Sequence, residues 1–441
     1  MRHVSLFAIC VYVVVTLVFT AGAAAPVSPA SNGDHRPATI LVSTGLNGAP
    51  TTDHSFHPSI SSDGRYVVYS STAANLAPND TYGSSDVFIY DRQTGKNSLV
   101  SMNSQGVKGD GFSAAGMISA NGRYVVFHSN SKNFGAGNSP NQDVYVRDLR
   151  KGLTSRVTNA VGGGSSNGDS NSWSISGDGR FVAFSSTATN LVADGTNSNW
   201  NIFLYDRQTG TIRLASVASD GSQSDGFSME PVVSDNGRWV AFWSGADNLA
   251  PNDTNGIYDV FVHDFKTGLT QRASLASDGT QANNGSDRFS MSADGRYIVF
   301  QSYASNLVRK DTNNSRDIFL HDMKTGKTTR INVSKTGSQA NGDSSMPSIS
   351  PDGEYVTFIS NADNLVPSDK KNIGEVFIKS LKSGDIRLIS RASNGALGKG
   401  EPIESRVSND GDWVTFSSAD TNLAPNDTNG FVDIFLVGPR E

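Results

Sequence analysis

Hydrophobic residues occur along this chain as short runs separated by polar turns, and the pattern repeats. The clearest run follows an Asp-Gly or Asn-Gly dipeptide seven times, as in DGRYIVF at 294–300. The copies begin at Asp63, Asn121, Asp178, Asn236, Asp294, Asp352 and Asp410. Subtracting successive positions gives spacings of 58, 57, 58, 58, 58 and 58 residues. A fixed period of this length, with several short strands in each unit, predicts a ring of repeated units.

Each unit contains four apolar runs of strand length. In the fourth unit, strands are predicted over 229–234, 238–244, 259–264 and 270–275. The Asp-Gly and Thr-Gly turns suit tight hairpins, because glycine supplies positive φ without steric cost. The second run is almost continuously apolar, which is typical of a strand buried on both faces. The predicted fold class is therefore all-β, a seven-bladed β-propeller of four-stranded antiparallel blades.

The two ends of the repeat region complement each other. The seventh unit stops after a third strand at 433–437, and the segment 38–45 matches fourth strands such as 211–217. We predict that the N-terminal strand pairs into the last blade and closes the ring, which leaves no long unpaired edge. The predicted organisation is a signal peptide at 1–25, a linker at 26–37 and a propeller at 38–441.

The first residues predict export. Arg2 precedes an uncharged, mostly apolar segment, 4–25, with small residues at 21–23, which indicates a cleaved secretory signal. The alternative is an uncleaved membrane anchor, since the segment is nearly long enough to span a bilayer. Cleavage is favoured, so the protein is expected to be secreted or periplasmic, with no membrane contact afterwards. The sole cysteine, Cys10, lies in this segment, so the mature chain would have no disulfide.

Charge narrows the choice of partners. The 441 residues include 36 Lys and Arg against 42 Asp and Glu, a formal net charge of -6. No basic run or basic-aromatic patch occurs, which argues against nucleic acid as a partner. We expect a monomer.

The repeat resembles a known family. The pattern S-x-D-G-R-Y-V-V-F-x-S followed by D-V-F-x-x-D-x-x-T-G, as in DVFIYDRQTG at 86–95, is similar to the TolB-type, WD-like propeller repeat. The resemblance covers about residues 38–438 and implies an exported propeller. TolB carries a separate α/β domain before its propeller and has fewer blades, and this sequence has no room for such a domain. TolB's role in cell-envelope translocation is therefore not carried over.

A second motif, D-T-N-x-x-x-D, recurs at 253–259, 311–317 and 427–433, with a variant at 80–86. Oxygen side chains at positions 1, 3 and 7 of a tight loop suit Ca²⁺, and the pattern resembles a shortened calcium loop of integrin-type propellers. Ca²⁺ is the one candidate cofactor, at weak affinity. The alternative is that these residues cap turns. The candidate metal ligands are Asp80, Asp86, Asp253, Asn255, Asp259, Asp311, Asn313, Asp317, Asp427, Asn429 and Asp433.

Catalytic motifs are scarce. No H-E-x-x-H motif occurs, and the pair His54 and His57 is either a weak metal site or a solvated loop. His263 and His321 are predicted to be partly exposed strand residues. Aromatic and Met residues next to the inner strands could hold a peptide or glycan, or plug the channel. They are Phe56, Phe112, Trp173, Phe227, Met229, Phe289 and Met346.

The sequence thus predicts a non-catalytic binding or scaffold propeller, with calcium as a candidate aid to binding and with no catalytic or cofactor-binding residues. Its ligand would be a protein, peptide or glycan on the face that carries the long loops. Two alternatives stay open: an enzyme, lyase or hydrolase, acting at the channel mouth, and the propeller of a larger peptidase. Convergence of His54, His57 and acidic side chains in one pocket would favour an enzyme.

Overall fold

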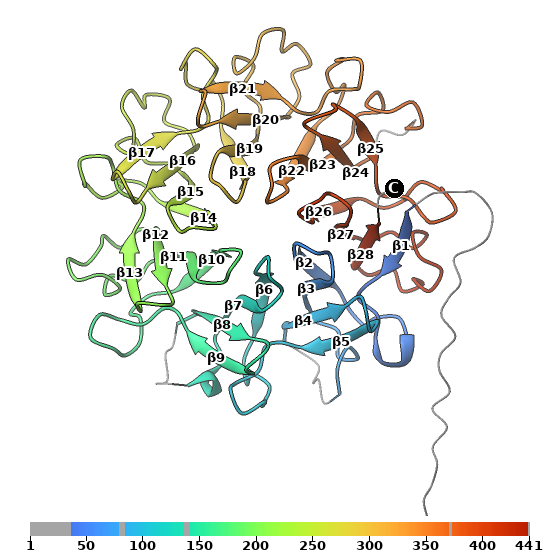
Figure 1. Ribbon diagram of the computed structural model, residues 1–441, viewed down its shortest axis with the longest axis horizontal. Coiled ribbons are helices and arrows are strands. Elements are labelled where there is room, and N and C mark those ends of the chain that lie inside the picture. Colours follow the sequence, from blue (N-terminus) through green and yellow to red (C-terminus); the bar gives the residue numbers. More distant parts are fainter. Residues whose placement is uncertain (1–36, 79–83, 136–140, 370–372, 440–441) are drawn as a thin grey trace, which may run out of the picture. The chain divides into compact units, whose positions relative to one another are not determined.

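The computed structural model describes residues 37–78, 84–135, 141–369 and 373–439. These residues form seven antiparallel sheets of four strands each, arranged as blades around a central axis (Figure 1). The predicted seven-bladed propeller is therefore confirmed. The predicted signal peptide lies outside the described residues. Within the described ranges, no helix is long and apolar enough to cross a membrane.

The strands have similar lengths in every blade. Blades 1 to 3 contain β2 (Ser55–Ile60), β3 (Tyr66–Ser71), β4 (Asp86–Asp91), β5 (Lys96–Leu99); β6 (Ser113–Ile118), β7 (Tyr124–Ser129), β8 (Asp143–Asp148), β9 (Leu153–Arg156); and β10 (Ser170–Ile175), β11 (Phe181–Ser186), β12 (Asn201–Asp206), β13 (Thr211–Leu214). Blades 4 to 6 contain β14 (Ser228–Val233), β15 (Trp239–Ser244), β16 (Asp259–Asp264), β17 (Leu269–Arg272); β18 (Ser286–Met291), β19 (Tyr297–Ser302), β20 (Asp317–Asp322), β21 (Lys327–Arg330); and β22 (Ser344–Ile349), β23 (Tyr355–Ser360), β24 (Glu375–Ser380), β25 (Ile386–Leu388). Blade 7 contains β26 (Pro402–Val407), β27 (Val414–Ser418), β28 (Asp433–Gly438) and β1 (Ala38–Leu41). Two short 3-10 helices complete the regular structure, η1 (Leu46–Gly48) and η2 (Lys132–Phe134).

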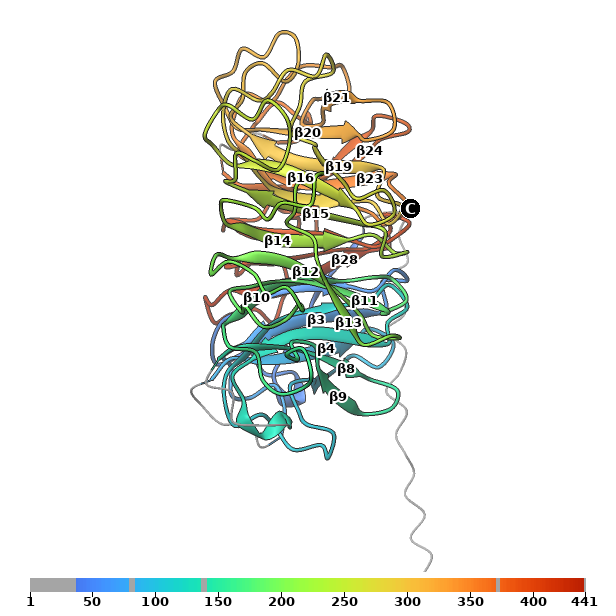
Figure 2. The same cartoon turned by 90° about the vertical axis from the view of Figure 1, so that its left-hand side faces the viewer.

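Within each blade the four strands lie side by side from the central axis to the outer edge, in the order given above (Figure 1). Viewed edge-on, the strands run between two loop faces (Figure 2). Because successive strands are antiparallel, the two short hairpin turns of a blade lie on one face and the two longer connections on the other. We call the second one the long-loop face. The inner strands, such as β2 and β14, begin at this face.

Strands from the two ends of the sequence share blade 7. β1 pairs antiparallel with β28, and Ala38 lies opposite Gly438 while Leu41 lies opposite Phe435. The pairing continues past β1, because the Val42 N–H donates to the Ile434 carbonyl at 2.8 Å. The Ser43 hydroxyl then donates to Asp433 Oδ1 at 2.6 Å. The outermost strand of the last blade is therefore the first strand of the chain.

Aromatic pairs form the centre of each blade. The second and third strands each contribute one ring, and the two rings lie opposite each other with centroids 5.5–6.1 Å apart. The pairs are Tyr69–Phe88, Phe127–Tyr145, Phe184–Phe203, Phe242–Phe261, Phe300–Phe319, Phe358–Phe377 and Phe416–Phe435. Nearly all are fully buried, as predicted for strands covered on both faces by neighbouring blades.

The first hairpin turn requires glycine for two reasons, a positive φ and the close approach of an aromatic ring from the neighbouring blade. Gly237 has a φ of +66°, and a Cβ added to it would lie 2.5 Å from the Phe181 ring of the preceding blade. The same close approach of an aromatic ring from the adjacent blade recurs in the other six blades. The pairs are Gly64–Trp413, Gly122–Tyr66, Gly179–Tyr124, Gly295–Trp239, Gly353–Tyr297 and Gly411–Tyr355. The repeated Asp-Gly turn therefore also provides room for packing between blades.

Replacing this glycine is expected to be more harmful than the backbone angle alone requires. Gly237→Ala should lower the free energy of unfolding by about 2–5 kcal/mol, from the left-handed φ and the forced shift of Phe181. Gly268→Ala is the matched control, because Gly268 has a φ of +75° but nothing within 4 Å of an added Cβ. Gly268→Ala should lower the free energy of unfolding by only about 1–2 kcal/mol. Equal losses in urea unfolding would contradict the packing role.

Candidate active site at the channel mouth

A bulge interrupts the innermost strand of every blade, at the third residue in blades 1 to 6 and at the second residue, Ile403, in blade 7. The ladder between the first and second strands shifts register in each blade at this point. The third residues are His57, Ala115, Ser172, Glu230, Arg288, Met346 and Glu404, and all except Glu404 have positive φ. Bulges redirect side chains and are common next to active sites. The seven residues form a ring around the long-loop end of the channel, which we call the bulge ring.

Side chains from the preceding blade satisfy backbone donors that the bulges free. The Ala115 N–H donates to Ser70 Oγ at 2.5 Å, and the Met346 N–H donates to Gln301 Oε1 at 3.0 Å. In blade 1 the acceptor is charged, since the His57 N–H donates to Glu404 Oε1 at 2.7 Å. A buried backbone donor without a partner is costly, so these contacts hold the bulges in place.

His57 and Glu404 form a pair across the junction of blades 1 and 7. His57 Nδ1 lies 3.0 Å from Glu404 Oε1, and the side chains are 57% and 11% exposed. Because the carboxylate accepts the Nδ1 proton, the tautomer that it favours leaves Nε2 as a proton acceptor. The geometry is that of a base oriented by a buried carboxylate.

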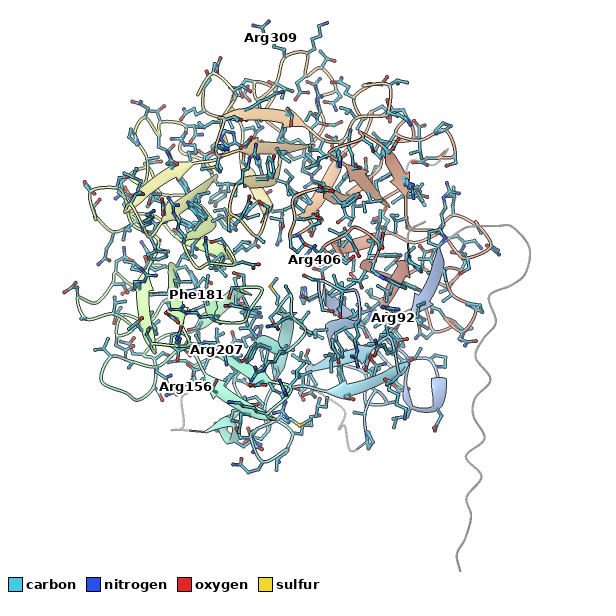
Figure 3. All side chains as sticks on the ribbon, in the orientation of Figure 1. Arg92, Arg156, Phe181, Arg207, Arg309 and Arg406 are labelled. Atoms are coloured by element: carbon cyan, nitrogen blue, oxygen red, sulfur yellow. The ribbon has the colours of Figure 1, made fainter. Side chains whose placement is uncertain are left out.

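Arg406 lies beside this pair on the innermost strand of blade 7. Its guanidinium lies 3.8 Å from Glu404 Oε2 and donates to the Ser405 carbonyl at 2.9 Å. The residue lies near the centre of the propeller (Figure 3). Burial raises the pKa of Glu230 in blade 4, and the Arg406 charge is a minor influence that opposes this rise.

Glu230 is paired with the next member of the bulge ring. Glu230 Oε1 lies 2.7 Å from Arg288 Nη1, and the side chains are 31% and 49% exposed. Asp287 precedes Arg288 and accepts a hydrogen bond from Gln301 at 2.7 Å. The mouth of the channel thus carries one exposed cation, Arg288, and one half-buried cation, Arg406, among three carboxylates.

The two bulge-ring carboxylates are shifted in opposite directions. Burial raises the pKa of Glu230 above its ordinary value, and the Arg288 charge only partly opposes this. Burial also acts to raise the pKa of Glu404, but hydrogen bonds from His57 and the Arg406 charge outweigh it and lower the pKa below the ordinary value. Two carboxyl groups separated in this way are suited to act as an acid and as an ionised partner.

The predicted aromatic ring is only partly at the mouth. Trp173 is 7% exposed, and its Nε1 donates to the Ala115 carbonyl at 2.8 Å, so it packs between blades instead. It also contacts His128, whose pKa burial lowers to about 4. The other six residues are half-buried: Phe56, Phe112, Phe227, Met229, Phe289 and Met346.

The histidine predictions need correction. His54 and His57 do not share one site, because His54 Nδ1 accepts the Val432 N–H at 2.9 Å while His57 pairs with Glu404. His263 and His321 were expected to be partly exposed, but they are 4% and 5% exposed. Third strands are covered by the adjacent blade, and each imidazole there meets a threonine hydroxyl of the fourth strand at 2.8 Å.

The D-T-N-x-x-x-D loops lie on the long-loop face, away from the bulge ring. Arg272 lies 3.4 Å from Asp253 and 3.5 Å from Asp259, and Arg330 lies 3.3 Å from Asp311 and 2.9 Å from Asp317. Lys108 lies 2.7 Å from Asp86. Asp80 lies outside the described residues.

The asparagines of these loops cap turns, as the alternative interpretation expected. Asn255, Asn313 and Asn429 each accept the backbone N–H two residues later, at 3.3, 3.3 and 3.0 Å. Asp427 and Asp433 are the aspartates of the set that have neither a lysine nor an arginine paired with them among the described residues. Calcium binding by these loops stays a prediction.

Two other features do not make a competing site. The segment 164–168 reads G-x-S-x-G, a serine-nucleophile pattern, but Ser166 is 3% exposed and donates to Asp143 at 3.0 Å. A depression of about 630 Å³ between blades 4 and 5 is lined by Arg238 and Asp264. That arginine and aspartate are held in a bidentate pair at 2.7–2.8 Å, so their charges are already satisfied.

Sequence reasoning missed Glu230, Arg288, Glu404 and Arg406, and it treated His57 as a loop residue. A signal for most of them exists in the repeat. Each bulge-ring residue lies seven positions before the turn glycine, so aligning the units places the ring in one column. That column reads H, A, S, E, R, M, E, and the columns on either side also vary, whereas the column two positions earlier is serine in six of the seven units. Variation inside a regular repeat marks positions that the fold does not dictate.

No family model and no curated protein matches this sequence. Solved structures do match. An oligogalacturonate lyase from Vibrio parahaemolyticus has a TM-score of 0.54 at 12% identity, covering 92% of this chain and 98% of the lyase. The Pyrococcus horikoshii acylaminoacyl peptidase has a TM-score of 0.51 at 12% identity, covering 83% of this chain and 49% of the peptidase. TolB from Acinetobacter baumannii has a TM-score of 0.39 at 14% identity, covering 86% of this chain and 81% of TolB, so the TolB-type family stays a resemblance.

These comparisons overturn the prediction of a non-catalytic binding or scaffold propeller, because the similar propellers belong to enzymes. The likeness itself establishes the fold. An oligogalacturonate lyase has also been solved in complex with manganese. The described residues of this chain contain no group of three or more His, Cys, Asp or Glu arranged to hold a metal ion, so the channel residues do not fit such a site.

Proposed function

We propose that this chain is an enzyme that cleaves an acidic oligosaccharide at the mouth of its channel, by β-elimination. The observation that carries the proposal is the joint arrangement of His57, Glu404 and Arg406. It combines an oriented, exposed base with a cation in one ring. The cations at the channel mouth supply attraction for an anionic substrate.

Each step of a β-elimination can be assigned to a residue at the channel mouth. His57 Nε2 would take the proton from the carbon next to the sugar carboxylate, and that electron pair would form the double bond as the glycosidic carbon–oxygen bond breaks. Arg406 would stabilise the negative charge that develops on the sugar carboxylate. Glu230, with its raised pKa, would give a proton to the leaving oxygen. No oxidant, reductant or water is needed.

The substrate class follows from charge. Arg288 and Arg406 are positioned to bind carboxylates of a uronate chain, and guanidinium groups suit that geometry. The likeness to an oligogalacturonate lyase propeller supports the same class. The apolar segment at 4–25 supports action outside the cytoplasm, where such polymers occur.

Hydrolysis of the glycosidic bond is the second candidate. It is favoured by the opposite pKa shifts of Glu230 and Glu404, since glycosidases also use one protonated and one ionised carboxyl group. In that reaction water would add across the broken bond and no double bond would form.

One assay separates these functions. The full-length chain is incubated with oligogalacturonate and with oligosaccharides of other uronates, and ultraviolet absorbance and new reducing ends are followed together. Elimination is expected to raise both signals, because the unsaturated product absorbs. Hydrolysis would raise the reducing ends alone. Neither signal on any uronate, from a chain with a cooperative thermal transition, would reject the proposal.

A further inference from the structure

Buried acids on the long-loop face are matched by cations from blade to blade. The third strand starts with an aspartate in blades 1, 2, 4 and 5, and each has a basic partner. The pairs are Asp86–Lys108, Asp143–Arg156, Asp259–Arg272 and Asp317–Arg330. In blade 3 the acid is replaced by Asn201 and the arginine position by Leu214, so both charges are absent together. These blades therefore balance charge at this position.

Blade 7 keeps the acids and lacks the cation. Asp427 and Asp433 are 2% and 0% exposed. The arginine position is Leu41, which lies opposite Phe435 as Arg272 lies opposite Phe261. In blade 1, Lys108 lies nine residues after Leu99, the last residue of the outermost strand. The residue nine positions after Leu41, the corresponding strand end in blade 7, is Pro50. Both positions that supply a cation elsewhere are thus uncharged here.

The carboxylates of blade 7 have oxygens without a partner. Both oxygens of Asp427 and Oδ2 of Asp433 are buried and accept no hydrogen bond from the described residues. The Asn429 N–H faces Asp427 without hydrogen-bond geometry. Burial and the Asp433 charge raise the pKa of Asp427 to about 7, and the Asn429 N–H opposes this rise without cancelling it. Oδ1 of Asp433 accepts hydrogen bonds from Ser43 and Thr51 at 2.6 and 2.8 Å.

The nearest titratable group does not supply the missing charge. His54 Nδ1 accepts the Val432 N–H at 2.9 Å and makes no ion pair with Asp433 among the described residues. Asp420 adds a further negative charge, and its Oδ1 accepts the Gly400 N–H at 2.7 Å. Two buried carboxylates without a counter-charge are costly, so a bound cation would stabilise the folded state.

We infer that blade 7 binds a Ca²⁺ ion through Asp427 and Asp433, at the place that arginine takes in blades 4 and 5. Carboxylate oxygens are preferred by hard cations, and neutral oxygens and water would complete the shell. Two formal charges suit an affinity of roughly 10⁻⁴–10⁻³ M. This inference is independent of the proposed activity. Since Ser43 and Thr51 also bind Asp433, the ion would connect the N-terminal segment to β28.

Calcium binding is tested on the full-length chain by thermal unfolding and titration calorimetry with CaCl₂ alone. Addition of roughly 10 mM Ca²⁺ should raise the melting temperature by about 2–5 °C relative to excess chelator. Asp427→Asn, which keeps the shape, should lose the rise and the calorimetric signal. Asp253→Asn should keep the rise in melting temperature and the calorimetric signal, because Arg272 already neutralises the acids of that loop.

Leu41→Arg provides the opposite test. It places a guanidinium at the arginine position, so it should raise the melting temperature in chelator and remove the response to calcium. Leu214→Arg, in blade 3 where Asn201 replaces the acid, is the matched control and should lower the melting temperature while leaving the calcium response intact. No calorimetric signal from the unmodified chain, or a calcium response that survives Asp427→Asn, would overturn the inference.

Discussion

Deleting residues 38–44 is expected to unfold the whole ring rather than to shorten one blade. Val42 is fully buried and packs in one apolar cluster with Val67 and Tyr69 of blade 1 and Leu436 of blade 7. The deletion removes this contact, the β1–β28 ladder and the hydrogen bond that the Ser43 hydroxyl donates to Asp433. Large apolar truncations cost about 2–5 kcal/mol each, and whole proteins are stable by only about 5–15 kcal/mol.

The measurement is urea unfolding followed by circular dichroism. The truncated chain should show no cooperative transition, or a midpoint far below that of the full chain. A peptide of residues 37–46 added in trans should restore the transition, because an exposed sheet edge accepts a complementary strand. The same peptide with Val42→Asp is the matched control and should fail. An unchanged midpoint after deletion would contradict this role of β1.

The fold was predictable because the sequence repeats its constraints. One period, seven glycine turns and paired aromatics all specify the same unit, so local and global signals agree. Boundaries were less accurate where side chains replace backbone contacts. The strand predicted at 270–275 ends as β17 at Arg272, since Ser274 Oγ accepts the Val260 N–H at 3.1 Å in place of a backbone carbonyl.

The site was less predictable because its residues meet only when the ring closes. His57 and Glu404 are 347 residues apart, and their contact depends on blades 1 and 7 lying side by side. Local alternation also fails at a bulge, which changes the direction of one side chain. The acidic loops illustrate the opposite difficulty. Their aspartates form a recognisable motif, but the neutralising Arg272 and Arg330 belong to the next strand.

Removing the proposed base should abolish most of the activity without unfolding the protein. His57→Gln keeps a donor toward Glu404 but cannot accept the proton, so kcat is expected to fall about 10²–10⁴-fold. The kcat of Glu404→Gln should fall by a comparable factor, because the His57 imidazole loses the carboxylate that orients it. Glu354→Gln, on an exposed short turn of the opposite face, is the control and should keep full activity. Melting temperatures identify any variant that is merely destabilised.

The pH dependence then distinguishes a proton donor from a substrate-binding carboxylate. Glu230 acts in its protonated form in the proposed mechanism, and burial raises its pKa, so the rate should fall as the pH rises through that value. Glu230→Gln cannot donate a proton, so kcat should drop about 10²-fold or more and this alkaline decline should disappear. If Glu230 only binds substrate, the variant would raise KM and keep the decline. That result would leave the elimination without its acid, because no other bulge-ring carboxyl group has a raised pKa.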